Sequence, residues 1–188
     1  MILLLNGLSR CGKDTVARYI SYEYGYVHLK ISSHLKRCAS LLFDIPLQDF
    51  ENSNKDMVCT KWNRTPRDCL KFLGTDVFQH QIETFIPGIR RRFWIDHLHK
   101  DIEAALRREK NVVISDYRFK HEFDSLSEKF PNENIHVVHI IPKFEGFRMP
   151  QNIDETEQMR PYDHVLHNCT IDQMLKEVDT LLISLPQK

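Results

Sequence analysis

Residues 2–15 read Ile-Leu-Leu-Leu-Asn-Gly-Leu-Ser-Arg-Cys-Gly-Lys-Asp-Thr, an apolar run that leads directly into a phosphate-binding loop pattern. The pattern G-x-x-x-x-G-K falls between a predicted buried strand and a predicted helix, which is the context that this motif requires. Gly7 and Gly12 allow the backbone to curl, so that successive N–H groups point inward at a polyphosphate. Lys13 can reach the terminal phosphates, and the helix that begins there turns its positive end toward the same anion. The stretch therefore predicts a nucleotide-phosphate site.

The residue after Lys13 departs from the usual pattern. Ser or Thr is common there because its hydroxyl binds Mg²⁺, whereas this chain has Asp14 followed by Thr15. A carboxylate is a stronger Mg²⁺ partner, but it repels the terminal phosphate unless the metal lies between them. The alternative interpretation, an ordinary strand-to-helix turn with two glycines, leaves the lysine at the mouth of the turn unexplained.

The composition limits the classes of partner. The 188 residues are 41% apolar and 28% charged, with 26 basic and 26 acidic side chains, so the formal net charge is zero. General binding to a nucleic acid polymer or a membrane surface would require a basic excess, and we expect neither partner. No signal peptide or membrane-length apolar run is visible, and the five cysteines form no C-x-x-C pair. These features predict a cytoplasmic protein with free thiols.

Strand-like and helix-like segments alternate along the chain, which predicts an α/β fold with a five-stranded parallel sheet and helices on both faces, in three layers. We expect a single domain over 1–188, with a substrate-binding helical excursion at about 33–95 and a lid-like loop at about 142–161. The predicted strands are 2–6, 26–31, 111–115, 136–141 and 164–167. The predicted helices are 13–24, 33–43 (capped by Ser33), 66–84 (capped by Thr65), 92–108, 120–130 and 171–182. The polar stretch 44–64 is predicted to be a loop.

A second group of functional side chains, Ser115-Asp116-Tyr117-Arg118, follows a short buried strand. Ligands of open parallel sheets bind outside the carboxyl ends of the strands. Asp116 is therefore a candidate metal and substrate ligand, and Arg118 a candidate for bidentate phosphate binding. The alternative is structural: Asp116 caps the next helix and Arg118 pairs with Glu122.

Further basic residues are candidates for a second phosphate site: Lys36, Arg37, Arg64, Arg67, Arg148 and Arg160. Arg148, in the proline-rich loop, either closes over the transferring phosphoryl group or is a surface residue. A phosphomonoester acceptor is already anionic and needs only charge screening and alignment, which scattered Arg and Lys supply. An alcohol acceptor would need a carboxylate base, and Asp116 keeps that option open.

Several segments, in order along nearly the whole chain, resemble the deoxynucleoside monophosphate kinases of bacteriophages and large DNA viruses. The resemblance rests on Gly-Lys-Asp-Thr at 12–15, Arg67 before Leu73-Gly74-Thr75-Asp76, Phe93-Trp94, Ser115-Asp116-Tyr117-Arg118 with Glu122, and 163–168. It implies a P-loop kinase fold and transfer of the ATP γ-phosphate to a deoxynucleoside 5′-monophosphate with Mg²⁺. The family carries Asp at the position of Asp14, whereas Cys11 stands where Ser is common.

The resemblance also implies roles for individual residues. ATP would be bound by Gly7, Arg10, Gly12, Lys13, Asp14, Thr15 and Asn168, the last of these in a loop beside the adenine. The acceptor would be surrounded by Lys36, Arg67, Trp94, Asp116 and Arg118. Mg²⁺ would be held by Asp14 and Asp116, and catalysis would depend on Lys13, Asp116 and Arg118. Arg148 is added to the catalytic residues because of its position in the proline-rich loop.

Two rival interpretations remain at this stage. Animal-type phosphomevalonate kinases share Gly-Lys-Asp and an Asp-x-Arg after a buried strand, and they also phosphorylate a phosphate. A P-loop protein that binds nucleotide without transferring phosphate is a different class, against which Lys13, Asp116 and Arg118 argue. Apolar positions on the 92–108 helix could serve a homodimer or the core.

Overall fold

The computed structural model describes residues 1–146 and 162–186. Arg148, Arg160 and most of the predicted lid at 142–161 lie outside the described residues. The chain divides into two compact units, one formed by Met1–Lys30 with Lys100–Lys188 and the other by Ile31–His99. The predicted excursion at about 33–95 falls within the second unit, and the expectation of a single domain stays a prediction.

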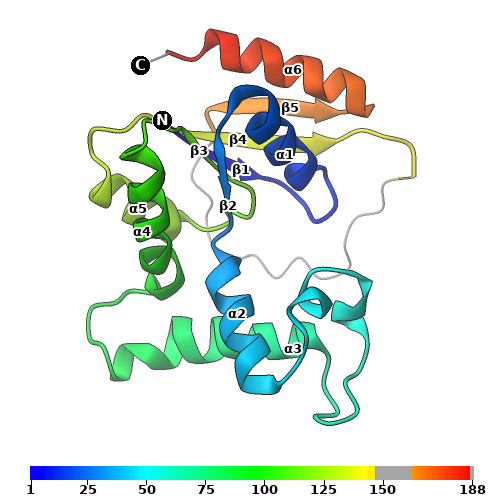
Figure 1. The fold of residues 1–188 in the computed structure, drawn as a ribbon, viewed down its shortest axis with the longest axis vertical. Helices are drawn as coiled ribbons and strands as arrows, with labels where there is room; N and C mark the ends of the chain where they lie inside the picture. The colour runs from blue at the N-terminus through cyan, green and yellow to red at the C-terminus, as the bar shows by residue number, and fades with distance from the viewer. Residues whose placement is uncertain (147–161, 187–188) are drawn as a thin grey trace. The chain divides into compact units, whose positions relative to one another are not determined.

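The first unit contains a five-stranded sheet in which every strand pairing is parallel (Figure 1). Its strand order is β2-β3-β1-β4-β5. The strands are β1 (Ile2–Asn6), β2 (Val27–Leu29), β3 (Val112–Ile114), β4 (Ile135–Pro142) and β5 (His164–Asn168). β1 and β3 are buried throughout, as expected for parallel strands covered on both faces. The predicted fold class is confirmed, and the carboxyl ends of β1 and β3 carry the two motifs found in the sequence.

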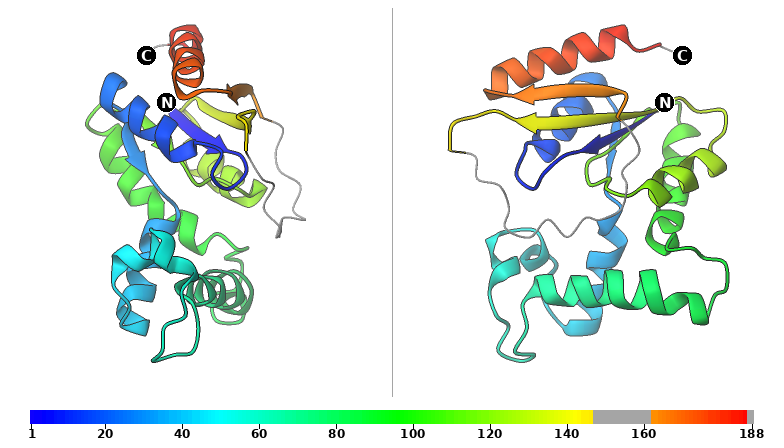
Figure 2. Two further views of the ribbon diagram at one scale, coloured as in Figure 1. Left: turned by 90° about the vertical axis from the view of Figure 1, so that its right-hand side faces the viewer. Right: turned by 180° about the vertical axis from the view of Figure 1, so that it is seen from behind.

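Helices cover both faces of this sheet (Figures 1 and 2). On one face, α1 (Lys13–Tyr24) and α6 (Ile171–Ser184) share an apolar core with alternate residues of the strands, such as Leu3 and Leu5. On the other face lie α5 (Lys120–Lys129) and the last turns of α4 (Phe93–Leu106), joined by an ion pair of 2.8 Å between Lys129 and Glu103. Because the strands alternate sides, each face receives its own set of apolar side chains.

The second unit is helical and has a separate small core around Phe50, Cys69 and Leu73. α2 (Ser32–Phe43) leads into two short 3₁₀ helices, Leu47–Phe50 and Ser53–Asp56, where the sequence predicted a loop. The predicted helix over 66–84 is present as three consecutive parts. These are α3 (Pro66–Lys71), a π-helical segment (Phe72–His80) and a 3₁₀ turn (Gln81–Thr84).

The caps show which sequence signals were sufficient. Thr65 caps α3 as predicted, in a reciprocal capping box with Asp68. Gly25 ends α1 in the left-handed conformation, with φ of 67°. Ser33 does not cap α2, because that helix begins one residue earlier and its N-cap position is Ile31.

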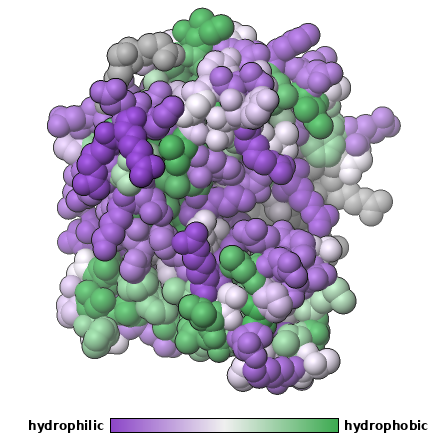
Figure 3. All heavy atoms as spheres, in the orientation of Figure 1, coloured by the Kyte–Doolittle hydropathy of each residue, from purple (hydrophilic) through white to green (hydrophobic). Residues whose placement is uncertain are grey.

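The surface is mixed in character (Figure 3). Exposed apolar side chains of the second unit include Leu41, Leu42 and Phe85. The apolar positions considered for a homodimer lie on α4, and five of them are buried: Trp94, Ile95, Leu98, Ile102 and Ala105. They therefore serve the core, and a homodimer stays a prediction. Within the described part of the chain, no helix is both long enough and apolar enough to cross a bilayer.

Candidate nucleotide-phosphate site

The loop between β1 and α1 has the curled backbone that the glycine pattern predicts. Gly7 and Gly12 have φ angles of 139° and 106°, which side-chain-bearing residues rarely adopt. Neither position has room for a side chain, because an added Cβ would lie 2.6 Å from the Ile140 carbonyl oxygen at Gly7 and 2.9 Å from the Asn168 amide nitrogen at Gly12. Arg10, also at positive φ (66°), is exposed. Both glycines are therefore required by the shape of the loop itself.

Lys13 folds back over this loop. Its ammonium group donates to the carbonyl oxygens of Gly7 (2.6 Å) and Leu8 (2.7 Å), and it lies 3.7 Å from the Cys11 sulfur. The charge is thus held at the mouth of the loop by backbone dipoles. A polyphosphate bound there would meet the lysine next to the first backbone N–H groups of α1.

Asn168 fastens the loop from the opposite side. It is the last residue of β5 rather than part of a following loop, and its side chain is buried. Its amide donates to the Cys11 carbonyl oxygen at 2.9 Å. The buried thiol of Cys11 fills the space beneath Gly7, and burial raises its pKa although Lys13 acts in the opposite direction. The contacts of Asn168 are with the loop backbone, and a position beside adenine stays a prediction.

Asp14, in the first turn of α1, accepts two contacts on one oxygen. The Lys30 ammonium lies 2.9 Å from its Oδ1, and the Ser115 hydroxyl donates to the same atom at 2.7 Å. Burial raises the pKa of this carboxyl group, but the hydrogen bonds from Lys30 and Ser115 outweigh it and bring the pKa below its ordinary value. Asp14 is therefore ionised at neutral pH, and its side chain remains 57% exposed.

These properties fit a magnesium ion that also binds nucleotide phosphates. Mg²⁺ in such sites takes one or two carboxylates, keeps several waters and completes its shell with phosphate oxygens. Among the described residues, no group of three or more His, Cys, Asp or Glu side chains is placed to hold a metal without such help. Asp14 supplies the ionised, accessible carboxylate that this arrangement needs.

The segment after β3 is held by buried polar side chains on two neighbouring elements. Asn6 donates to the Tyr117 carbonyl oxygen at 3.1 Å and also bonds His139 at 2.9 Å. Glu122 accepts from the backbone N–H groups of Arg118 (2.8 Å) and Phe119 (3.0 Å). Burial raises the pKa of Glu122 to about 8 against the opposing effect of these two bonds.

Asp116 does not cap the next helix, because the N-cap of α5 is Phe119. Its charge acts on both His28 and Glu122, so the carboxylate lies near both residues. Arg118, two residues later, is exposed. The first unit thus gathers the predicted loop residues, Asp116 and Arg118 at the carboxyl ends of β1 and β3.

The other predicted acceptor-site residues belong to the helical unit. Lys36 forms an ion pair with Glu51 at 3.3 Å. Arg67 donates two hydrogen bonds to the Asp56 carboxylate, at 2.6 and 3.2 Å. Trp94 is buried and donates to the Gly74 carbonyl oxygen at 3.3 Å. The indole is thus buried and bonded to the backbone of its own unit, and a role in substrate binding stays a prediction.

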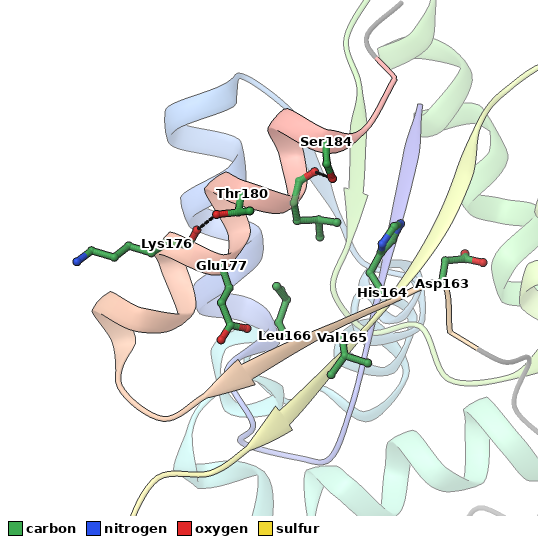
Figure 4. Close-up of a pocket in the computed structure, with 9 residues that line it drawn as sticks. Asp163, His164, Val165, Leu166, Lys176, Glu177, Thr180 and Ser184 are labelled. Atoms are coloured by element: carbon green, nitrogen blue, oxygen red, sulfur yellow. Dashed lines mark hydrogen bonds between the residues drawn. The ribbon is translucent and has the colours of Figure 1, made fainter.

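A groove of about 570 Å³ lies elsewhere on the first unit, between β5 and α6 (Figure 4). None of the residues predicted for the site lines it. The figure shows Glu177 directed at β5, where its carboxylate accepts from the backbone N–H of His167 at 2.7 Å. The groove is therefore separate from the candidate site.

The sequence analysis missed the residues that support the site. Lys30 and Ser115 on Asp14, and Asn6 and Glu122 around the 115–118 segment, were assigned no role beyond a pairing of Glu122 with Arg118. Their neighbours in the fold come from other elements, and Ser115 lies 101 positions from Asp14. The one available signal was the position of Asn6 and Ser115 at the carboxyl ends of adjacent strands.

Comparison with known proteins gives one relative that is named as a kinase, among the curated proteins, and no family model. A search against family models found no match. A curated mimivirus protein (Acanthamoeba polyphaga mimivirus) named "Putative deoxynucleotide monophosphate kinase" is 27% identical over 134 residues, covering 68% of this chain and 69% of its own length.

Solved structures show the fold. A sugar kinase from Janibacter sp. HTCC2649 matches with a TM-score of 0.53 and 17% identity, over 98% of this chain and 95% of that one. The APS kinase CysC of Mycobacterium tuberculosis, solved with AMPPNP and APS, gives a TM-score of 0.52 and 15% identity over 97% of both chains. With the parallel sheet and phosphate loop described above, these likenesses show that the chain has the P-loop kinase fold.

Proposed function

We propose that this protein is a deoxynucleoside monophosphate kinase, which transfers the γ-phosphate of ATP to a dNMP and releases ADP and dNDP. The observation that carries the proposal is the phosphate loop with Lys13 at its mouth and an ionised Asp14 beside it. The name of the mimivirus relative supports the substrate class.

We assign each residue of the site a role according to its position. The loop backbone and Lys13 bind the β- and γ-phosphates of ATP, and Asp14, with Asp116, would hold Mg²⁺. A magnesium ion held there would supply positive charge against that of the phosphates. Arg118, exposed after β3, would bind the acceptor phosphate. For Arg67 and Lys36, which belong to the helical unit, a role as acceptor ligands stays a prediction.

The acceptor needs no general base. An oxygen of the dNMP phosphate, already anionic, forms a bond to the γ-phosphorus while the bond from that phosphorus to the β–γ bridging oxygen breaks. The leaving electrons stay on ADP. Lys13 offsets the charge that develops on the transferring oxygens, which is electrostatic stabilisation of the transition state.

The test is ADP release with ATP and Mg²⁺ against a panel of acceptors. The panel contains dTMP, dGMP, dCMP, dAMP, dUMP, their ribose counterparts and phosphomevalonate. We expect turnover with at least one deoxynucleotide, abolished in Lys13→Ala. Turnover with phosphomevalonate alone would assign the protein to the rival kinase class. ATP binding with no turnover on any acceptor would indicate a nucleotide-binding role without transfer.

A further inference from the structure

The Asp14 carboxylate is held by a series of hydrogen-bonded side chains to which no sequence motif assigns a role. Ser115, at the end of β3, is 1% exposed, and its hydroxyl lies 2.7 Å from Asp14 Oδ1. The same hydroxyl oxygen lies 2.8 Å from Nε2 of His28 on β2. Since β2 and β3 are adjacent strands, their pairing fixes the positions of both residues.

The direction of each hydrogen bond follows from the ionisation of Asp14. An ionised carboxylate only accepts, so the single hydroxyl proton of Ser115 is donated to Asp14. The Ser115 oxygen must then accept from His28, which requires the proton of the imidazole to be on Nε2. The hydrogen bonds therefore run from His28 to Ser115 and from Ser115 to Asp14, and each donor is used once.

We propose that Ser115, oriented by His28, is a positioning residue that fixes Oδ1 of Asp14 and thereby directs the other carboxylate oxygen toward the metal of the nucleotide complex. This inference rests on the proposed function only in that the nucleotide arrives with Mg²⁺. The Lys30 ammonium group lies 2.9 Å from the same oxygen, but the lysine side chain is 27% exposed and flexible. Ser115 is the buried and rigid partner.

Two features favour a role in metal binding over a purely structural one. The carboxylate keeps 57% of its side-chain exposure while one oxygen is held twice, so the held geometry leaves the group open to a ligand. The second predicted metal carboxylate, Asp116, directly follows Ser115 in the sequence, and its charge also acts on His28. Buried partners that orient a metal-binding carboxylate are typically worth 10–100-fold in metal affinity.

The experiment measures ADP binding by calorimetry as a function of Mg²⁺, and separately in EDTA. In Ser115→Ala we expect the Mg²⁺ concentration at half-maximal effect to rise about tenfold, at the lower end of that range because Lys30 remains. ADP affinity in EDTA and the melting temperature should stay close to wild type. His28→Leu should shift the Mg²⁺ requirement in the same direction, and His28→Gln, which retains a donor, should restore most of it.

A double-mutant cycle with Asp14→Asn tests the route of the effect. If Ser115 acts through Asp14, then Ser115→Ala produces no further change in the Mg²⁺ requirement once Asp14 is replaced. An unchanged Mg²⁺ requirement in both Ser115→Ala and His28→Leu, or an equal loss of ADP affinity in EDTA, would overturn the proposal. Because the readout is ADP binding, it remains decisive even if the protein transfers phosphate to no acceptor.

Discussion

At the scale of single residues, the phosphate loop shows how far a local motif determines a site. The glycines and Lys13 were predictable because the curl of the loop and the reach of the lysine depend on residues within seven positions of one another. The supports of Asp14 were not, since Lys30 and Ser115 reach it only after β2 and β3 have paired. Sequence periodicity carries no information about which polar side chains meet across strands.

Lys13 gives the first prediction. In Lys13→Ala we expect kcat for ADP release to fall by at least about 10²–10³-fold, the usual cost of losing one charge-stabilising donor. The fold should persist, because the lost contacts are to carbonyl oxygens at the loop mouth that water can reach once the side chain is removed. Lys176→Ala, at an exposed position of α6, is the matched control and should retain activity. Near-wild-type turnover in Lys13→Ala would contradict the site assignment.

Replacing Asn168 distinguishes support of the phosphate loop from contact with the nucleotide base. Its amide serves the buried Cys11 carbonyl oxygen, so Asn168→Ala leaves that group unsatisfied and should cost about 1–3 kcal/mol of unfolding free energy. ADP affinity should fall as the loop loosens, without a change in base preference. Urea unfolding and calorimetry measure both, with the exposed Asn132→Ala as control. A variant of normal stability with altered preference between ATP and GTP would instead favour a position beside the base.

At the scale of elements, strands and helices followed from their patterns wherever one face was buried and the ends carried strong signals. Thr65 with Asp68, and Gly25, are local signals and were sufficient. The π-helical form of 72–80 was not predictable, because it depends on packing between helices. An added Cβ at Gly74 would lie 2.7 Å from Leu35, and its carbonyl oxygen accepts from Trp94. The Leu-Gly-Thr-Asp motif thus has a packing role in the helical unit.

The start of α5 gives a prediction on pH. Glu122 has a pKa of about 8 in the folded protein against 4.5 as its ordinary value, so between these values the folded state keeps a proton that the unfolded chain has lost. The free energy of unfolding should therefore decrease as pH rises from about 5 to 8, by up to about 1.4 kcal/mol per pH unit from this group. In Glu122→Gln that contribution should vanish. Urea unfolding across this range measures it.

The control for this experiment is Glu128→Gln, an exposed position on the same helix, which should keep the wild-type slope. The Glu122 contribution is isolated as the difference between the wild-type and Glu122→Gln curves. If the two curves are parallel throughout, Glu122 is ionised in the folded state.

At the scale of the whole molecule, the parallel sheet and its layers were predictable because alternating strands and helices leave few alternatives. The division into two units was only partly predictable: the excursion was visible, but its separate core around Phe50 and Leu73 was not. That core joins residues from several elements of the unit, and the sequence pattern of one element does not show which residues of another element it contacts.

Nucleotide binding should stabilise the folded chain as a whole. At a concentration 100 times its dissociation constant, MgADP contributes about 2.7 kcal/mol, or roughly 5–10 °C in melting temperature for a chain of this size. We expect a smaller rise with ADP in EDTA, since Asp14 then lacks its metal, and little rise in Lys13→Ala. Differential scanning fluorimetry provides the measurement. Identical shifts with and without Mg²⁺ would argue against a metal at this site.

The contact between Glu177 and β5 has a consequence for how copies of the chain meet. β5 is the last strand of the sheet, and strands at such positions tend to recruit strands from other molecules. An incoming strand would need the outward N–H of His167, which the Glu177 carboxylate already occupies at 2.7 Å. A strand added beside β5 would displace that carboxylate from its hydrogen bond and leave its negative charge buried in the new interface. Glu177 on α6 thus disfavours aggregation through the β5 edge of the sheet. We expect any homodimer to use another surface.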